Sequence, residues 1–227
     1  MPVKHIVLAC GLLLGISATA QAGLLDPAAV DASRFLPPPP VDGSDDNKAE
    51  FAELKAIAAR STPADLDAAT HDAKDEKFDL FNGAVGFDLT ALPETSKLLT
   101  MVGEEEEADT KAAKKYFHRI RPYSIDTSIK TCEFTMPGKA ANSYPSGHAS
   151  LAFSTGVVLA ALLPAKSQAI MARAFEYAEH RLVCGVHFRS DIVAGQQYGT
   201  ILALKLMDNP AFQAQMAKAR TELAAHT

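Results

Sequence analysis

The stretch YPSGHASLAFSTGVVLAALLP, residues 144–164, decides how this chain folds. After Ser146 and Gly147, apolar or small residues occupy almost every position up to Pro164, on all sides of a helix rather than along one stripe. A helix that is apolar all round is typical of the buried centre of a helical domain. We therefore predict a central buried helix that begins at the Ser-Gly pair and ends before Pro164.

The sequence on either side of this segment also has helical periodicity. From Ala49 onward, apolar residues recur three and four apart, with almost no period-two alternation. We expect helices at about 109–118, 167–182 and 190–207, with a short turn containing Cys184 and Gly185 between the last two. The predicted fold class is all-α, with a single compact helical domain over residues 49–227.

Two segments precede this domain. Residues 1–22 contain Lys4, an apolar run at 6–16 and small residues around Gln21, which predicts a secretory signal cleaved after Ala22. The alternative is a membrane anchor, but the run is shorter than the roughly 20 apolar residues that a bilayer requires. Residues 23–48 include four prolines at 37–40 and an acidic stretch at 41–46, so we expect an extended arm without a regular helix.

Export would change the charge and the meaning of the cysteines. Loss of residues 1–22 removes Lys4 and no acid, leaving 21 basic and 27 acidic residues and a formal charge of −6, which disfavours nucleic-acid binding. A periplasmic or secreted chain would keep only Cys132 and Cys184, which predicts a disulfide; two free buried thiols are the alternative. Such a bond stabilises a fold by roughly 4 kcal/mol in a chain-entropy treatment.

Cationic and anion-binding residues gather in the C-terminal half. Lys114 and Arg121 are seven residues apart, about two helical turns, so both can project to one side if the helix extends that far. Ser146, Gly147 and His148 stand at an expected helix N-terminus, where backbone N–H groups bind phosphate. An ordinary N-cap by Ser146 is the alternative for this tetrapeptide, and a solvated face is the alternative for the basic pair.

A third group adds a nucleophile. His187 and Asp191 are four residues apart, so on a helix the carboxylate can hold one imidazole nitrogen while the other attacks. A capping Asp beside a solvated His is the alternative. The turn before His187 would bring Arg181 close to it. Phosphoryl transfer needs cations and amide donors around the phosphate oxygens, an in-line nucleophile and a proton donor, all of which are present here.

The order of these three groups resembles the signature of the type 2 phosphatidic acid phosphatase superfamily: Lys114-x6-Arg121-Pro122, then Pro145-Ser146-Gly147-His148, then Arg181-x5-His187-x3-Asp191. Within that superfamily, the proline arm after Leu36 and the sequence VCGVH at 183–187 are similar to the class A bacterial nonspecific acid phosphatases. The resemblance covers most of the mature chain, and its specific part is residues 114–191.

The resemblance implies an all-helical domain and a role for each matching residue. Phosphate would be held by a cationic and amide set: Lys114, Arg121, Arg181 and the amides of Ser146 and Gly147. His187 would attack phosphorus, with Asp191 orienting it and stabilising its charge. His148 would protonate the leaving alcohol and then activate the water that hydrolyses phosphohistidine.

The implied protein is a metal-independent acid phosphatase without a cofactor, which hydrolyses small-molecule phosphomonoesters with broad specificity. Phosphotransfer to other alcohols would follow from the covalent intermediate. The expected partners exclude nucleic acid and membrane, and include other copies of the chain in a dimer or larger homo-oligomer. The cationic site would repel metal ions, and His71, Asp72 and Asp75 form only a weak metal-ligand pattern.

Two local features have competing interpretations. His180 occupies the position where the family usually has serine, and it lies either beside the phosphate site, where it tunes pH dependence, or on an outer helix face. The acidic run at 104–107 is interpreted as a solvated loop or helix start.

Three rival functions remain. A vanadium haloperoxidase uses the same residue pattern, although the short chain and the proline arm argue against it. A lipid phosphate or undecaprenyl pyrophosphate phosphatase usually has several membrane spans, which this sequence lacks. A non-enzymatic phosphate-binding module would not need both His148 and His187. Serine esterase and P-loop motifs are absent from the sequence.

Overall fold

The computed structural model describes residues 23–74, 76–132 and 141–226, so the predicted signal segment and Asp75 lie outside the described residues. Within these ranges the regular structure is helical and contains no strand, which confirms the all-α prediction. The α-helices are α1 (Ala32–Phe35), α2 (Asp45–Arg60), α3 (Pro63–Asp72), α4 (Asn82–Val85), α5 (Pro93–Phe117), α6 (Pro122–Ile125), α7 (Gly147–Leu162), α8 (Ser167–Val183), α9 (Arg189–Asp208) and α10 (Pro210–Ala224). Short 3-10 turns are η1 (Phe78–Phe81), η2 (Leu89–Ala91) and η4 (Pro164–Lys166).

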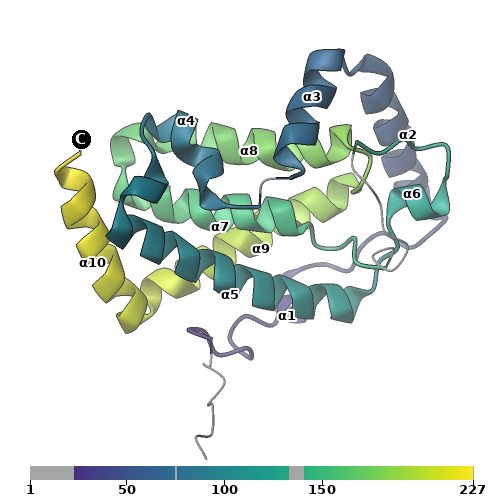
Figure 1. The fold of residues 1–227 in the computed structure, drawn as a ribbon. Coiled ribbons are helices and arrows are strands. Elements are labelled where there is room, and N and C mark those ends of the chain that lie inside the picture. The colour runs from purple at the N-terminus through teal and green to yellow at the C-terminus, as the bar shows by residue number, and fades with distance from the viewer. Residues whose placement is uncertain (1–22, 75, 133–140, 227) are drawn as a thin grey trace, which may run out of the picture.

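Helix α7 lies at the centre of the domain, as its apolar sequence predicts. It packs against α9, α8 and α5, and Figure 1 shows it between α8 and α5. Its side chains Ala152, Val158 and Leu159 are fully buried in the largest apolar cluster of the described chain. The predicted helices at 167–182 and 190–207 are also confirmed, as α8 and α9.

Two glycines allow α9 to approach α7 closely. A Cβ atom on Gly195 would lie 2.5 Å from the carbonyl oxygen of Ser146, and one on Gly199 would overlap the carbonyl oxygen of Ser150. Real Cβ atoms do not approach backbone atoms so closely, so only glycine fits at these two positions. The contact fixes the first turn of α7, which carries His148, against the helix that carries Asp191.

Helix α5 is longer than the sequence indicates. It begins at Pro93, sixteen residues before the expected start at 109, and ends where His118 adopts a left-handed conformation with φ of 50°. The acidic run therefore lies in mid-helix, so its interpretation as a loop or helix start was wrong; Glu104 and Glu107 are exposed, but Glu105 and Glu106 are buried. Glu105 accepts hydrogen bonds from the backbone N–H groups of Leu24 and Leu25 at 2.7 and 2.9 Å.

The N-terminal arm lies beside α5 and contains the short helix α1 (Figure 1). Tyr198 and Tyr144 donate hydroxyl hydrogen bonds to the carbonyl groups of Val30 and Pro37, at 2.7 and 2.6 Å. Helix α2 begins at Asp45, whereas we expected no helix before residue 49. The Ser44 hydroxyl explains the difference, because it caps the helix by accepting the Asn47 N–H at 3.2 Å.

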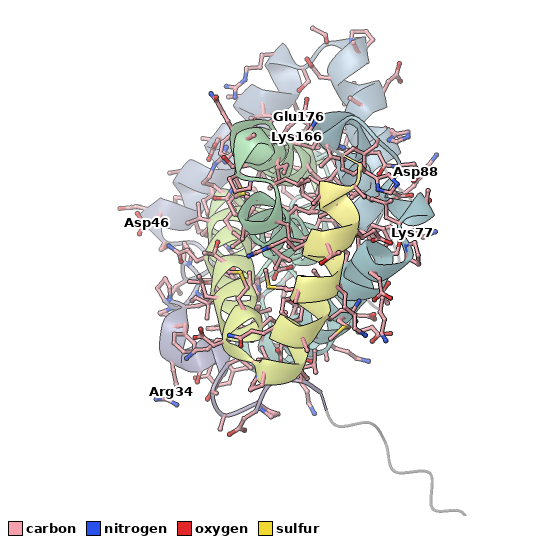
Figure 2. The ribbon with its side chains drawn as sticks, turned by 90° about the vertical axis from the view of Figure 1, so that its left-hand side faces the viewer. Arg34, Asp46, Lys77, Asp88, Lys166 and Glu176 are labelled. Carbon is pink, nitrogen blue, oxygen red and sulfur yellow. A yellow bond between two sulfur atoms is a disulfide. The ribbon has the colours of Figure 1, made fainter. Side chains whose placement is uncertain are left out.

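Helices α2 and α3 stand together at one end of the bundle, against α8, and α10 closes the opposite end against α5 (Figure 1). Figure 2 views this second end, with charged side chains such as Arg34 and Asp46 at the periphery. A disulfide joins Cys132 to Cys184, with Cα atoms 4.8 Å apart, as predicted. No helix in the described part of the chain combines the length and apolar character needed to cross a membrane.

Candidate active site

The first cations come from the end of α5 and the loop behind it. Lys114 lies in the last turn of α5, whereas Arg121 lies beyond the helix, where it precedes Pro122 of α6. The two residues therefore do not share a helix face, because the helix ends at Phe117. Arg121 is oriented by Asn142 Oδ1 and by the carbonyl oxygen of Val186, which accept its hydrogen bonds at 3.1 and 3.0 Å.

The N-terminus of α7 lies beside Lys114. The Nζ atom of Lys114 is 3.3 Å from the position that a Cβ on Gly147 would occupy, so glycine leaves this space to the ammonium group. Ser146 caps the helix, with its hydroxyl accepting the Ala149 N–H at 3.4 Å. Its own N–H donates to the carbonyl oxygen of Asp191 at 3.0 Å, so this amide is bonded within the protein, where we had expected it to face an anion.

The turn between α8 and α9 places the expected nucleophile. Gly185 has φ of 67°, and a Cβ there would overlap the carbonyl oxygen of Lys130, so the turn requires glycine. His187 follows, with Nδ1 3.3 Å from Oδ2 of Asp191. The same Oδ2 accepts the Ser143 hydroxyl at 2.6 Å and the Phe188 N–H at 2.8 Å, which orient the carboxylate.

Burial and cations act together on His187. The pKa of His187 is held well below its usual value by burial and then by the positive charges of Arg121, Lys114 and Arg181, while a hydrogen bond with the backbone of Ser143 opposes the shift. The imidazole is therefore neutral and keeps a lone pair. These three cations act on one imidazole, so the fold brings together the residues that the sequence singled out.

Arg119 was missed by the sequence analysis. It donates to Oδ1 of Asp191 at 2.6 Å and to Oε2 of Glu50 at 2.5 Å, and its guanidinium lies 4.2 Å from the ring centroid of Phe188. Glu50 also accepts the Ser190 hydroxyl at 2.6 Å. The only sequence signal was a second arginine two positions before Arg121, and nothing local identifies Glu50 as its partner.

His148 lies at the first turn of α7, stacked on Tyr177 with ring centroids 5.5 Å apart. Its Nδ1 is 3.3 Å from Oε1 of Glu76, while its buried Nε2 has no hydrogen-bond partner within the described residues. The pKa of His148 lies well below its usual value because of burial and then the positive charge of Arg181, the neighbouring His187 imidazole and the charge of Lys114, although a hydrogen bond with the backbone of Ala73 opposes this.

His180 faces α3. Its Nδ1 lies 2.6 Å from Oδ2 of Asp72, and Nη2 of Arg173 donates to Oδ1 of the same carboxylate at 2.6 Å. Burial disfavours the charged form of Asp72, yet the hydrogen bonds with His180 and Arg173 outweigh it and hold the pKa of Asp72 well below its usual range. Since Ala73 follows Asp72 and bonds to His148, His180 supports the segment behind that histidine.

A cavity of about 800 Å³, here named the α5 cavity, opens beside Lys114, Gly147 and His148. It runs along α5 past Glu106 and has apolar and charged lining residues, including Phe78, Leu99, Leu151, Glu76 and Lys111. In the part of the chain that the structure describes, no three His, Cys, Asp or Glu side chains are grouped as a metal site.

The sequence is similar to a protein family and to several known proteins. The profile of the PAP2 superfamily matches residues 96–212. The non-specific acid phosphatase of Providencia stuartii is 32% identical over 206 residues, covering 86% of this chain and 82% of that protein. The non-specific acid phosphatase of Salmonella typhimurium is 34% identical over 209 residues, covering 86% of this chain and 80% of that protein.

A solved structure shares the fold. It is the first transmembrane PAP2 type phosphatidylglycerolphosphate phosphatase from Bacillus subtilis, with a TM-score of 0.57 and 17% sequence identity. The match covers 85% of this chain and 96% of that one. At this identity the likeness concerns the arrangement of helices alone.

Proposed function

This chain belongs to the PAP2 superfamily as an acid phosphatase, and we propose that it hydrolyses phosphomonoesters of varied structure through a covalent phosphohistidine on His187. The observation that carries this proposal is the buried, neutral imidazole of His187 amid the charges of Arg121, Lys114 and Arg181. A cluster of cations around a neutral nucleophile suits an anionic electrophile and little else.

The phosphate group binds between these cations and the N-terminus of α7. Lys114 and Gly147 supply an ammonium and the first-turn amide, which together favour an anion at this helix end. Arg121 and Arg181 neutralise further oxygens. In this proposal Ser146 has a positioning role: its N–H donates to the carbonyl oxygen of Asp191, and its hydroxyl caps α7.

His187 then attacks phosphorus through Nε2, while Nδ1 faces Asp191. As the N–P bond forms, the imidazole gains positive charge, which the Asp191 carboxylate stabilises at 3.3 Å. The P–O bond to the leaving group breaks at the same time, and the electron pair goes to the alcohol oxygen. Hydrolysis of the N–P bond by water regenerates neutral His187.

His148 provides the proton for the leaving oxygen. Its unpartnered Nε2 is available to the reacting groups, because Nδ1 faces Glu76 on the other side of the ring. Burial and then the positive charges of Arg181 and Lys114 lower the pKa of His148, and a bound phosphate offsets those charges. Substrate binding therefore raises the pKa of His148, which favours the protonated imidazole that acts as a general acid.

Further parts of the proposal rest on the same intermediate and on the sequence. Any alcohol that reaches phosphohistidine in place of water accepts the phosphoryl group, which gives phosphotransfer. The sequence of residues 1–22, which has the pattern of a secretory signal, supports a periplasmic or secreted location in this proposal. We also expect a homodimer or larger assembly, which sedimentation of the purified chain would test.

The test is hydrolysis of p-nitrophenyl phosphate at mildly acid pH with excess EDTA. We expect turnover by the wild type, loss of at least a thousandfold in His187→Ala, and no change in the exposed control His226→Ala. Acid-labile, base-stable labelled phosphate should be trapped on the wild type alone. Full activity in His187→Ala, or a strict need for a metal, would contradict the proposal.

A further inference from the structure

The α5 cavity opens beside two residues of the proposed reaction, Lys114 and His148. In an in-line displacement the nucleophile and the leaving oxygen lie on opposite sides of phosphorus. Lys114 and His148, which contact the phosphate and the leaving oxygen in the proposed function, line this cavity; the described lining does not include His187. In this mechanism His187 attacks from the side of phosphorus opposite the cavity, and the cavity receives the leaving group. This inference rests on the proposed function.

Glu106 is a buried carboxyl in the wall of this cavity, with 5% of its surface exposed. Its Oε1 accepts the Thr110 hydroxyl at 2.6 Å, and the same hydroxyl lies 3.2 Å from Oγ of Ser150 on α7. Glu106, Thr110 and Lys114 are spaced four apart, so they follow one face of α5 toward the phosphate site. The proposed mechanism gives Glu106 no role.

The groups that act on Glu106 lie on α5, on α7 and in the segment before η1. Burial raises the pKa of Glu106 to about 7, against the hydrogen bonds of Thr110 and Ser150 and the charge of Lys114, while Glu76 adds to the rise. Lys114 is affected in return, since burial and Arg121 lower its pKa to about 8 and Glu106 opposes this. The cavity lining also contains charged residues of both signs and two histidines: Glu104, Glu107, Lys77, Lys111, Lys115, His118 and His148.

We propose that Glu106 determines specificity for the leaving group: its carboxylate rejects leaving groups that carry a second negative charge, and its protonation admits them. Neutral and cationic leaving groups enter in both states. A charge about 10 Å away in a partly buried site changes binding by roughly tenfold at an effective dielectric constant near 20. The preferred substrates near neutral pH are thus monoesters of neutral alcohols or amino alcohols, and not compounds with a second phosphate or carboxylate.

The experiment compares three aryl phosphates that differ at the para position only: methyl, carboxylate and aminomethyl. The kcat/KM of each is measured at intervals from pH 5.5 to pH 8 for the wild type, Glu106→Gln and the control Asp208→Asn, an exposed carboxylate that does not line the cavity. Comparing ratios between variants cancels the intrinsic reactivity of each ester. For the wild type and Asp208→Asn, we expect the methyl-to-carboxylate ratio to rise about tenfold between pH 5.5 and pH 8. For Glu106→Gln the methyl-to-carboxylate ratio should stay, at both ends of this range, at the low value that the wild type shows at pH 5.5.

A second variant guards against misfolding of the first. Thr110→Val removes a hydrogen bond that favours the Glu106 carboxylate, so the pH at which discrimination begins should move upward. If active enzymes show the same ratio in wild type and Glu106→Gln at both pH values, or if Thr110→Val leaves the midpoint unmoved, this inference is overturned alone. If the wild type hydrolyses none of the three esters, the proposed function is wrong, and the inference that depends on it is wrong as well.

Discussion

The guanidinium of Arg119 donates a hydrogen bond to the Asp191 carboxylate at 2.6 Å, and both side chains are buried. Asp191 faces His187 with its other oxygen, at 3.3 Å. The carboxylate beside the proposed nucleophile is thus bound on its other side by the Arg119 guanidinium, which also bonds to Glu50. Arg119 positions Asp191 without lining the α5 cavity.

Arg119→Leu should lower the free energy of unfolding by about 3–5 kcal/mol, because it leaves the buried carboxylates of Glu50 and Asp191 without their cation. Urea unfolding measures the change, with Arg60→Leu on the exposed end of α2 as the control. Adding Glu50→Gln to the first variant should recover part of the loss. Equal unfolding midpoints for wild type and Arg119→Leu would show that the network is not stabilising.

Gly199→Ala should destabilise the domain by roughly 2–4 kcal/mol, because its Cβ would overlap the Ser150 carbonyl oxygen and push α9 away from α7. Gly83→Ala is the matched control, since a Cβ there meets nothing within 4 Å. Its effect should stay within about 1 kcal/mol and favour α4 through helix propensity. Thermal unfolding of both variants measures the two losses of stability. Similar losses for Gly199→Ala and Gly83→Ala would mean that the close contact between α7 and α9 does not account for the effect.

Glu106 should make stability depend on pH. Its pKa is about 7 in the folded chain against an ordinary value of 4.5, so the neutral form is favoured by folding. The stabilisation is complete below pH 4.5 and is lost as pH rises through 7, with an amplitude on the order of 3 kcal/mol. Urea unfolding of wild type and Glu106→Gln across this window should diverge by that amount. Parallel curves would contradict the predicted titration.

His180→Ser, which introduces the residue usual in the resembling family, should lower the free energy of unfolding by about 1–3 kcal/mol. The reason is loss of the charge-assisted bond to Asp72 at 2.6 Å. The pKa of Asp72 should rise, so the variant loses stability earlier than the wild type as pH falls. His71→Ser is the control, because that imidazole is exposed beside the same carboxylate. A kcat change above tenfold would mean that His180 acts on the reaction itself.

Local signals explain which helices could be predicted. α7, α8 and α9 begin and end within about two residues of the expected positions, because Gly147, Pro164 and Gly185 mark their limits. The predicted helix at 109–118 was shorter than α5, because four consecutive glutamates at 104–107 are typical of a solvated segment. The burial of the middle two, Glu105 and Glu106, depends on partners that no local pattern reveals, such as the Leu24 amide for Glu105 and Ser150 for Glu106.

The site was predicted by residue type more fully than by geometry. Lys114, Arg121, Arg181, His148 and His187 influence one another electrostatically in the fold, as the motif order suggested. Arg121 reaches the site from a loop because His118 ends α5 in a left-handed turn without a glycine signal. Arg119 binds Glu50 across 69 residues, a separation that no sequence period encodes.

The glycine contact between α7 and α9 also bears on protein engineering. Gly195 and Gly199 lock together two helices that carry or adjoin His148, Gly147, Asp191 and His187. A designer who wished to transfer these site residues to another scaffold would have to move α7 and α9 together, with their relative position unchanged. The remaining cations, Lys114, Arg121 and Arg181, lie outside this pair and could then be supplied by separately optimised segments.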